Sequence, residues 1–459
     1  MRSKLLILFL CVCVACTNSR LNKENITITV DVEKIPEYGF VISNQDGHMQ
    51  TLEFDTNRHA EYIIENLEAA YLTLHNGFSE NINFYAEKGD QIHLTYDGIS
   101  MEKTLKTNGV RQPIIDYLKK IKISWIDPQN YTLGITEFSK LLEKEIKKNL
   151  VLLDSNKTTL SKASKKFITL EQNRIKYLMG ISLLNYPEKH QKAFPNSVLQ
   201  INKEYYNTLK EWMQEDATLL CLNEYQYFML KSSSILAELG IQTNTPYEKL
   251  LAQMKYIQSH LKNEQVKQSL LTILAHDYIE QNGIEKIEEL DQFYRQHITD
   301  PQLKSQYETV FNSWATIAPG QKAIDFNAAD STGKMFSLQD FKGKYVYIYL
   351  WLNVYPCIKE YKTLKELQPL LDEKKITLVS LSLENDQEQW KNALSNQEIQ
   401  TGLHLYLGQN KDFLRAYHYD SYGIDQFIMI DPHGNIIQTH APKPSSEEFK
   451  NLLQSLSKI

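Results

Sequence analysis

Hydrophobic and polar positions alternate at the start of the chain beyond residue 24. Four β-branched residues within Ile26–Val32 share one face, and Thr27, Thr29 and Asp31 lie on the other. This period-two pattern predicts a half-buried strand. Further strand patterns cover 81–86 and 91–96, and turn sequences stand at Lys88-Gly89-Asp90 and Asp46-Gly47. Residues 25–105 are therefore predicted to form a small antiparallel β-sandwich.

Residues 110–315 have helical periodicity. Thr245-Pro246 with Glu248 combines an N-cap, a proline at the first helical position and a capping-box carboxylate, and Asp300-Pro301 opens a second helix. The apolar stripes that follow are most simply core positions. Cys221 stands in the apolar stretch 217–230, and we interpret it as an inert core thiol rather than a redox partner.

From residue 317 onward, strand and helix patterns alternate. The apolar runs 345–351 and 376–383 predict strands that are buried on both faces, with a helix over 357–371 between them. A strand at 427–430, a turn at 431–434, a strand at 435–438 and a helix at 445–456 with Ser446 as its cap complete the pattern. A βαβ unit followed by a hairpin and a helix is a thioredoxin-type layout.

Composition then limits the class of protein. The 459 residues carry 50 Lys and Arg against 56 Asp and Glu, so the formal net charge of −6 argues against a nucleic-acid-binding protein. The length predicts two to four domains at about 100–200 residues each. We expect a multidomain α+β protein with a signal segment at 1–15, a β-rich domain at 25–105, a helical region at 110–315 and an α/β domain at 317–459.

Residues 1–15 are predicted to be an export signal. A cationic start with Arg2 and Lys4 precedes the apolar run 5–12, and small residues lead to Cys16. The segment resembles a bacterial lipoprotein signal, which implies that Cys16 is acylated and anchors the mature chain to a membrane. Thr17 after this cysteine resembles the sorting preference for the outer membrane, facing the periplasm. Loss of Cys11 and Cys13 with the signal leaves Cys221 and Cys357 as the thiols, so a disulfide framework is excluded.

Short blocks in the last third of the chain resemble TlpA-like and ResA-like thioredoxin-fold proteins of the redoxin superfamily. The blocks are 320–326, 333–334, 338–344, 350–351, 356–360, 382–386 with Trp390, and 430–434. The sequence at 84–96 is similar to the β-rich domain that precedes such a domain in lipoproteins of Bacteroidetes-type bacteria. The resemblance implies thiol–disulfide exchange with protein or peptide partners, and no cofactor.

The motif that performs this exchange is incomplete in this chain. Redox-active members carry Cys-x-x-Cys at a helix N-terminus, where the helix dipole stabilises the thiolate of the first cysteine and the second resolves the mixed disulfide. Here Pro356-Cys357 retains the inner cysteine, and the outer position is held by Val354 or, counted forward from Trp351, by Tyr355. The family's cis-proline is matched by Asp425, and a cis bond before a non-proline residue costs about 2.5–4 kcal/mol.

Two interpretations of Cys357 remain open. As a functional residue, it is a lone thiol near a helix N-terminus that can form a mixed disulfide. As a structural residue, it is the inner cysteine kept as a small apolar side chain, which we favour because thiolate chemistry needs access as well as a lowered pKa.

Other chemistries find no support in the sequence. No two histidines lie three or four residues apart, and neither a phosphate-binding loop nor a Gly-x-Ser-x-Gly motif is present. We therefore expect a TlpA-like envelope lipoprotein with weak, monothiol or lost redox activity. The alternative is a non-catalytic lipoprotein that uses a degenerate thioredoxin fold to bind a protein or peptide.

Overall fold

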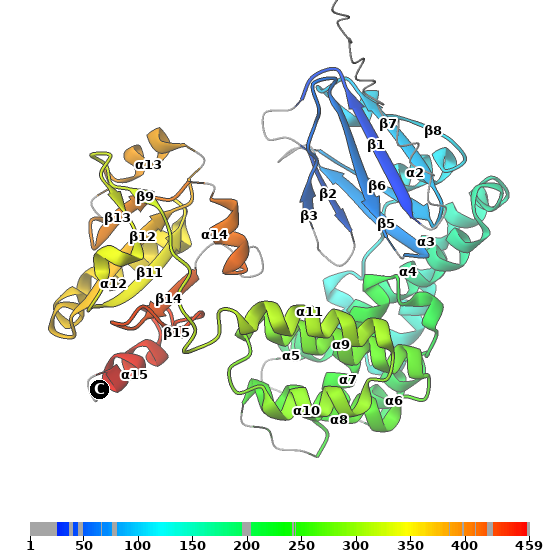
Figure 1. Ribbon diagram of the computed structural model, residues 1–459. Helices are drawn as coiled ribbons and strands as arrows, with labels where there is room; N and C mark the ends of the chain where they lie inside the picture. The colour runs from blue at the N-terminus through cyan, green and yellow to red at the C-terminus, as the bar shows by residue number, and fades with distance from the viewer. Residues whose placement is uncertain are drawn as a thin grey trace, which may run out of the picture. The chain divides into compact units, whose positions relative to one another are not determined.

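The computed structural model describes residues 25–456 apart from 36–39, 45–48, 66, 76–79, 195–202, 241–242, 244, 385, 397–398, 409 and 420–425. The chain divides into two compact units, one ending at Leu239 and the other beginning at Gly240 (Figure 1). This division falls within the expected helical region, between α7 (Asn223–Ala237) and α8 (Pro246–His260). The domain boundaries inferred from the sequence pattern stay predictions.

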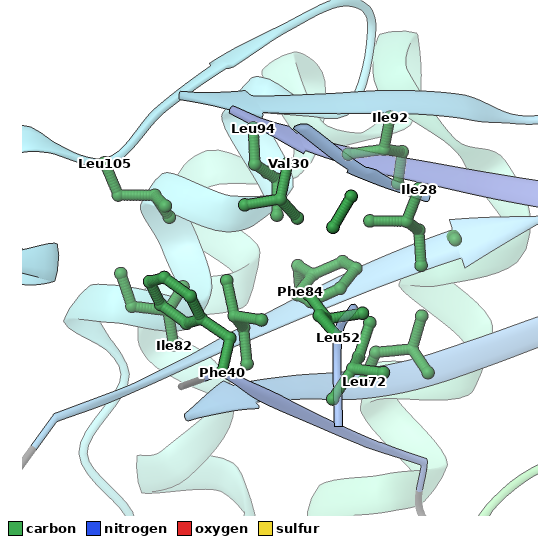
Figure 2. Packing of buried hydrophobic residues seen from close by; sticks show 14 of the residues in the cluster. Ile28, Val30, Phe40, Leu52, Leu72, Ile82, Phe84, Ile92, Leu94 and Leu105 are labelled. Atoms are coloured by element: carbon green, nitrogen blue, oxygen red, sulfur yellow. The ribbon is translucent and has the colours of Figure 1, made fainter. Parts of the chain in front are cut away.

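The first unit begins with two four-stranded sheets. One has the order β4 (His59–Ile64), β1 (Ile26–Val32), β7 (Gln91–Tyr96) and β8 (Lys106–Asn108), and the other the order β3 (Met49–Thr51), β2 (Val41–Asn44), β5 (Ala69–His75) and β6 (Asn81–Glu87). Figure 2 shows side chains of one sheet, such as Val30 and Leu94, facing Phe84 and Leu72 of the other. The expected sandwich is confirmed.

The expectation of a purely antiparallel sandwich is wrong for one pair of strands. β1 and β7 run parallel, with Ile28 paired to Ile92. The turn after β6 leads from one sheet into the other, so β6 and β7 do not form a hairpin and β7 instead enters beside β1. Gly89, with a φ of 83°, provides the left-handed conformation that this turn needs.

Helices complete the first unit. They are α1 (Met101–Thr104), α2 (Gln112–Lys120), α3 (Ile135–Ala163), α4 (Lys165–Leu184), α5 (Tyr186–Ala193), α6 (Lys203–Trp212) and α7, with 3₁₀ turns η1 (Pro128–Thr132) and η2 (Ala217–Leu219). Cys221 is half-exposed, with its Sγ 3.5 Å from the carbonyl oxygen of Thr218. The expectation of a buried core thiol is therefore wrong for Cys221, because it lies in the connection before α7 and not on a helix face.

The second unit starts with α8, α9 (Glu264–Asn282), α10 (Glu288–His297) and α11 (Pro301–Ala315). Thr245 and Glu248 form the predicted capping box of α8. The Asp300 carboxylate accepts the backbone N–H groups of Gln302 and Leu303 at the start of α11. Both predicted helix starts are confirmed.

A seven-stranded sheet follows in the second unit. Its order is β10 (Met335–Phe336), β9 (Ala328–Ala329), β13 (Leu403–Tyr406), β12 (Ile376–Ser382), β11 (Tyr345–Trp351), β14 (Gln426–Ile430) and β15 (Ile436–Gln438). Its other elements are η3 (Leu338–Phe341), α12 (Tyr355–Glu373), α13 (Gln387–Ala393), α14 (Lys411–Ala416) and α15 (Glu447–Ser455). β11 pairs in parallel with β12 and antiparallel with β14, which pairs with β15. The βαβ unit, the hairpin and the final helix of the thioredoxin-type layout are thus confirmed.

Some sequence expectations fall outside the described residues. These are the signal segment with Cys16, the turn at Asp46-Gly47 and the cis-proline position Asp425. Within the described ranges, no helix combines the length and the apolar character needed to cross a membrane.

Candidate functional site

The candidate site lies where the central parallel strands end. β11, β12 and β13 run in the same direction, so their carboxyl ends share one edge of the sheet, where α/β proteins commonly place their sites. The connection from β11 to α12 is only three residues long, Leu352 to Val354. The N-terminus of α12 is therefore held at this edge by the buried strand that precedes it.

The start of α12 presents the residues of the incomplete motif. Val354 is the N-cap with extended backbone angles (φ −126°, ψ 155°), and its side chain is half-buried. Tyr355 opens the helix and is 77% exposed. Pro356, also exposed, occupies the second helical position, where no backbone N–H donor is needed. Val354 and Tyr355 are the two residues that the sequence offers for the outer position of the motif, and neither side chain has sulfur.

Cys357 lies on the inner side of the same turn. It is 0% exposed and belongs to the buried cluster of Trp351, Tyr361 and Leu364. The Tyr349 hydroxyl donates a hydrogen bond to the Cys357 carbonyl oxygen at 3.1 Å, which fixes the first helical turn against β11. A nucleophilic thiol must reach its disulfide partner in line with the S–S bond. Cys357 does not reach the surface in this arrangement.

Glu384 is a site residue that sequence reasoning missed. It lies two residues after the end of β12, and its Oε1 accepts the backbone N–H of Asn353 at 2.6 Å, just before α12. A carboxylate at a helix N-terminus is stabilised by the helix dipole and by the N–H groups there. The signal was present in the sequence block 382–386, but its position beside α12 depends on the parallel pairing of β11 with β12.

Other polar groups near α12 have structural partners. Glu360 is buried, and its two carboxylate oxygens accept the Ser445 backbone N–H at 3.1 Å and the Ser445 hydroxyl at 2.7 Å. Burial raises the pKa of the Tyr361 hydroxyl. Both oxygens of the Glu360 carboxylate are therefore hydrogen-bonded to Ser445, just before α15. The Tyr361 hydroxyl stays protonated.

His404 is the histidine whose ring approaches this buried cluster. Its ring centroid lies 5.5 Å from that of Tyr361 and 6.1 Å from that of Trp351. Burial lowers the pKa of His404 to about 4. A neutral imidazole cannot supply the positive charge that lowers the pKa of a reactive cysteine. The site has buried aromatic and apolar packing where exchange chemistry needs an exposed, activated thiol.

Among the residues that the structure describes, no group of three or more His, Cys, Asp or Glu side chains is arranged to hold a metal ion. Asp425 lies outside those residues.

Comparisons with known proteins agree with this fold. The Redoxin family model matches residues 318–456. Over 152 residues, the chain is 24% identical to the thiol-disulfide oxidoreductase ResA of Bacillus cereus, a match that covers 33% of this chain and 86% of ResA.

Two solved structures from Bacteroides vulgatus are also similar. A solution structure of a proposed thiol-disulfide oxidoreductase is 34% identical, covering 29% of this chain and 87% of that one, with a TM-score of 0.27. The thioredoxin domain of a thiol-disulfide oxidoreductase is 27% identical, covering 30% and 96%, with a TM-score of 0.27.

The Redoxin match spans the whole α/β part of the second unit, and the ResA match has a similar extent. The chain is a TlpA- and ResA-like thioredoxin-fold protein of the thiol–disulfide oxidoreductase-like family, and residues 318–456 are its Redoxin domain.

Proposed function

We propose that this protein is an exported, lipid-anchored envelope protein whose thioredoxin-fold domain has lost disulfide exchange and binds a protein or peptide partner. The observation that carries the proposal is the complete burial of Cys357, the one cysteine at the N-terminus of α12. Exchange needs an exposed thiolate and a resolving thiol. Here the outer position has no thiol and the inner thiol is part of the core.

The exposed face beside Cys357 supports a binding role. Tyr355 is 77% exposed at the first position of α12, and a tyrosine combines a large apolar surface with a polar tip, which suits protein contacts. Glu384 adds a carboxylate beside the first turn of α12, where Tyr355 lies. When the motif is counted forward from Trp351, Tyr355 occupies the position of the outer cysteine, from which redox-active relatives attack their substrates.

Lipid anchoring is proposed from the sequence around Cys16. A short apolar segment after Arg2 and Lys4 ends at this cysteine, as in lipoprotein signals. We expect a Cys16→Ser variant, produced in the native bacterium, to lose labelling by radioactive palmitate and to leave the membrane fraction. Retention of both properties by the variant would contradict the anchor.

Loss of exchange is tested with a disulfide substrate. Residues 17–459 with Cys221→Ser are incubated with insulin and dithiothreitol, and insulin precipitation is followed in parallel with a Cys357→Ser variant. We expect both proteins to match the rate with dithiothreitol alone. Faster precipitation that disappears with Cys357→Ser would establish a monothiol activity and overturn the proposal.

A further inference from the structure

A cavity of about 220 Å³ lies in the Redoxin domain at the edge of the sheet opposite the N-terminus of α12. Its floor includes Val346, at the beginning of β11, and Ile430, at the end of β14, which are paired across the two strands. β11 has seven residues at about 3.3 Å each, so about 20 Å separates the cavity from the site around Cys357. The cavity is thus a separate feature of the domain.

The lining of the cavity combines buried apolar side chains with exposed charged ones. Val346, Ile430 and Phe341 are buried, and Leu338 is half-buried. Lys322, Lys342 and His433 are exposed around the opening. A concave apolar surface with a few convergent polar groups is the usual form of a small-molecule site.

The walls are held in place by backbone hydrogen bonds. The Ala323 N–H donates to the Gly434 carbonyl oxygen and the Gly343 N–H to that of Pro432, each at 3.0 Å. Gly434 has a φ of 78°, a conformation that glycine adopts without strain in a tight turn. The cavity is therefore largely preformed, and a ligand would not have to order it.

The carboxylates of the lining are already used by protein donors. Asp325 Oδ1 accepts the N–H groups of Phe326 at 2.8 Å and Leu338 at 2.7 Å. Asp431 accepts the N–H groups of His433 and Asn435, both at 2.8 Å, and the Asn435 side-chain amide at 2.9 Å. The oxygens of these carboxylates already accept hydrogen bonds from the protein. Their negative charge still disfavours a ligand with two negative charges.

The ammonium groups are more available to a ligand. Lys322 Nζ donates to the His433 carbonyl oxygen at 2.9 Å, which uses one of its three N–H bonds. Among the described residues, Lys342 takes part in no ion pair within 4 Å. Two exposed lysines of the lining therefore have N–H groups to offer to a monovalent anion.

We propose that this cavity binds a small monocarboxylic acid, with an aromatic or branched aliphatic body on Val346, Ile430 and Phe341 and its carboxylate at Lys342 and Lys322. A dry cavity of about 150 Å³ accommodates benzene, so a cavity of this size holds one ring and a short chain. The neutral amide of the same acid lacks the charge that the lysines recognise.

The test uses 3-phenylpropanoate as the probe and residues 17–459 as the protein. Saturation-transfer NMR gives the dissociation constants of the acid, of 3-phenylpropanamide and of acetate. We expect the acid to bind in the millimolar range, as its small size allows, and the amide and acetate to bind about tenfold more weakly.

Three variants locate the binding. Lys342→Met removes one charge from the rim. We expect it to weaken the binding of the acid about fivefold without changing the affinity for the amide. Ala323→Leu adds three carbons to the lining, and we expect it to weaken the binding of the acid and of the amide equally. Lys365→Met removes an exposed lysine of α12 and serves as the matched control, with unchanged affinity.

The outcomes decide the proposal in either direction. Weaker binding after Lys342→Met and Ala323→Leu, at unchanged melting temperature, supports it. Absence of saturation transfer to the acid at 10 mM, equal affinity for acid and amide, or equal affinity of all three variants and the parent overturns it. If Ala323→Leu fails to fold, Lys342→Met at the surface decides alone. We expect Cys357→Ser to leave the affinity for the acid unchanged. The binding test is therefore independent of the test of disulfide exchange.

Discussion

Cys357 is surrounded by core side chains although it stands at the start of a helix. Its neighbours in the buried cluster include Trp351 and Tyr361. In this place a thiol acts as a small apolar group. Under the proposed loss of exchange, Cys357 serves packing alone, and the residues proposed for the outer position, Val354 or Tyr355, have no sulfur.

The stability of variants separates a core thiol from a surface one. We expect Cys357→Ser to lower the free energy of unfolding by about 1–3 kcal/mol, because it buries a hydroxyl where sulfur packed. Cys221→Ser, at a half-exposed position, serves as the control and should change it by less than about 0.5 kcal/mol. Urea titrations of both variants give the two values. Equal small effects would show that Cys357 is not packed as described.

At the scale of elements, the N-terminus of α12 lies at the edge where the parallel strands of the thioredoxin-type sheet end, and neither Val354 nor Tyr355 there has sulfur. The helix begins at the same edge where β11 and β12 end, and Val354 remains as its N-cap. Glu384 adds a negative charge here by accepting the Asn353 N–H. A helix N-terminus favours a thiolate, whereas a nearby carboxylate disfavours it.

Restoring a thiol at this helix tests the electrostatics directly. We expect Val354→Cys, in the Cys221→Ser background, to give a surface thiol whose reaction with a thiol reagent is measurable in the native protein. Adding Glu384→Gln removes the competing charge and should lower the pKa of the introduced thiol by about one unit. The absorbance of the thiolate at 240 nm against pH measures this value. An unchanged pKa after Glu384→Gln would contradict the role given to that carboxylate.

A second set of contacts joins elements in the first unit. Glu171 on α4 is fully buried, and its carboxylate accepts the hydroxyls of Tyr71 on β5 and Tyr117 on α2 at 2.8 and 3.2 Å. Arg174 donates to both oxygens at 2.7 Å and lies 3.6 Å from Glu224 on α7. One buried ion pair thus connects the sandwich with three helices.

Breaking this pair should be costly. Glu171→Gln leaves the Arg174 charge buried without its bidentate partner, and we expect a loss of about 3–5 kcal/mol in the free energy of unfolding. The double variant with Arg174→Met should recover part of that loss, because no lone charge remains. Chemical denaturation of the parent, Glu171→Gln, Arg174→Met and the double variant completes the cycle. A single-variant loss below about 1 kcal/mol would show that the network contributes little.

At the scale of the whole molecule, much of the fold could be predicted from periodicity. The alternation in β1 and the apolar runs of β11 and β14 identify strands because burial on one or two faces leaves a local pattern. Strand partners leave no such pattern, so the parallel pairing of β1 with β7 was missed. Glu384 was missed for the same reason, since the pairing of β11 with β12 brings it to α12.

The pH dependence of stability is also a property of the whole molecule. Burial lowers the pKa of His404 and of His440 to about 4, from about 6.5 in the unfolded chain. Above pH 6.5 both states hold these rings neutral, and between pH 6.5 and 4 the unfolded state binds more protons. Stability is therefore lost as the pH falls through this range, by up to about 3 kcal/mol for each ring.

A variant assigns this loss to one residue. We expect His404→Phe, which keeps an aromatic ring beside Trp351 and Tyr361, to reduce the fall in unfolding free energy between pH 7 and pH 4.5. Urea titrations of the parent and the variant at several pH values give the two slopes. Identical slopes would mean that His404 is protonated as easily in the folded as in the unfolded protein.

The most direct test of the central claim is a count of reactive thiols. Residues 17–459 with Cys221→Ser have Cys357 as their one remaining thiol, and Ellman's reagent reports its reaction by absorbance at 412 nm. The buried position predicts no release of chromophore from the native protein over hours and one equivalent at once in 6 M guanidinium chloride. Release of one equivalent within minutes from the native protein would contradict the loss of exchange chemistry proposed for this domain.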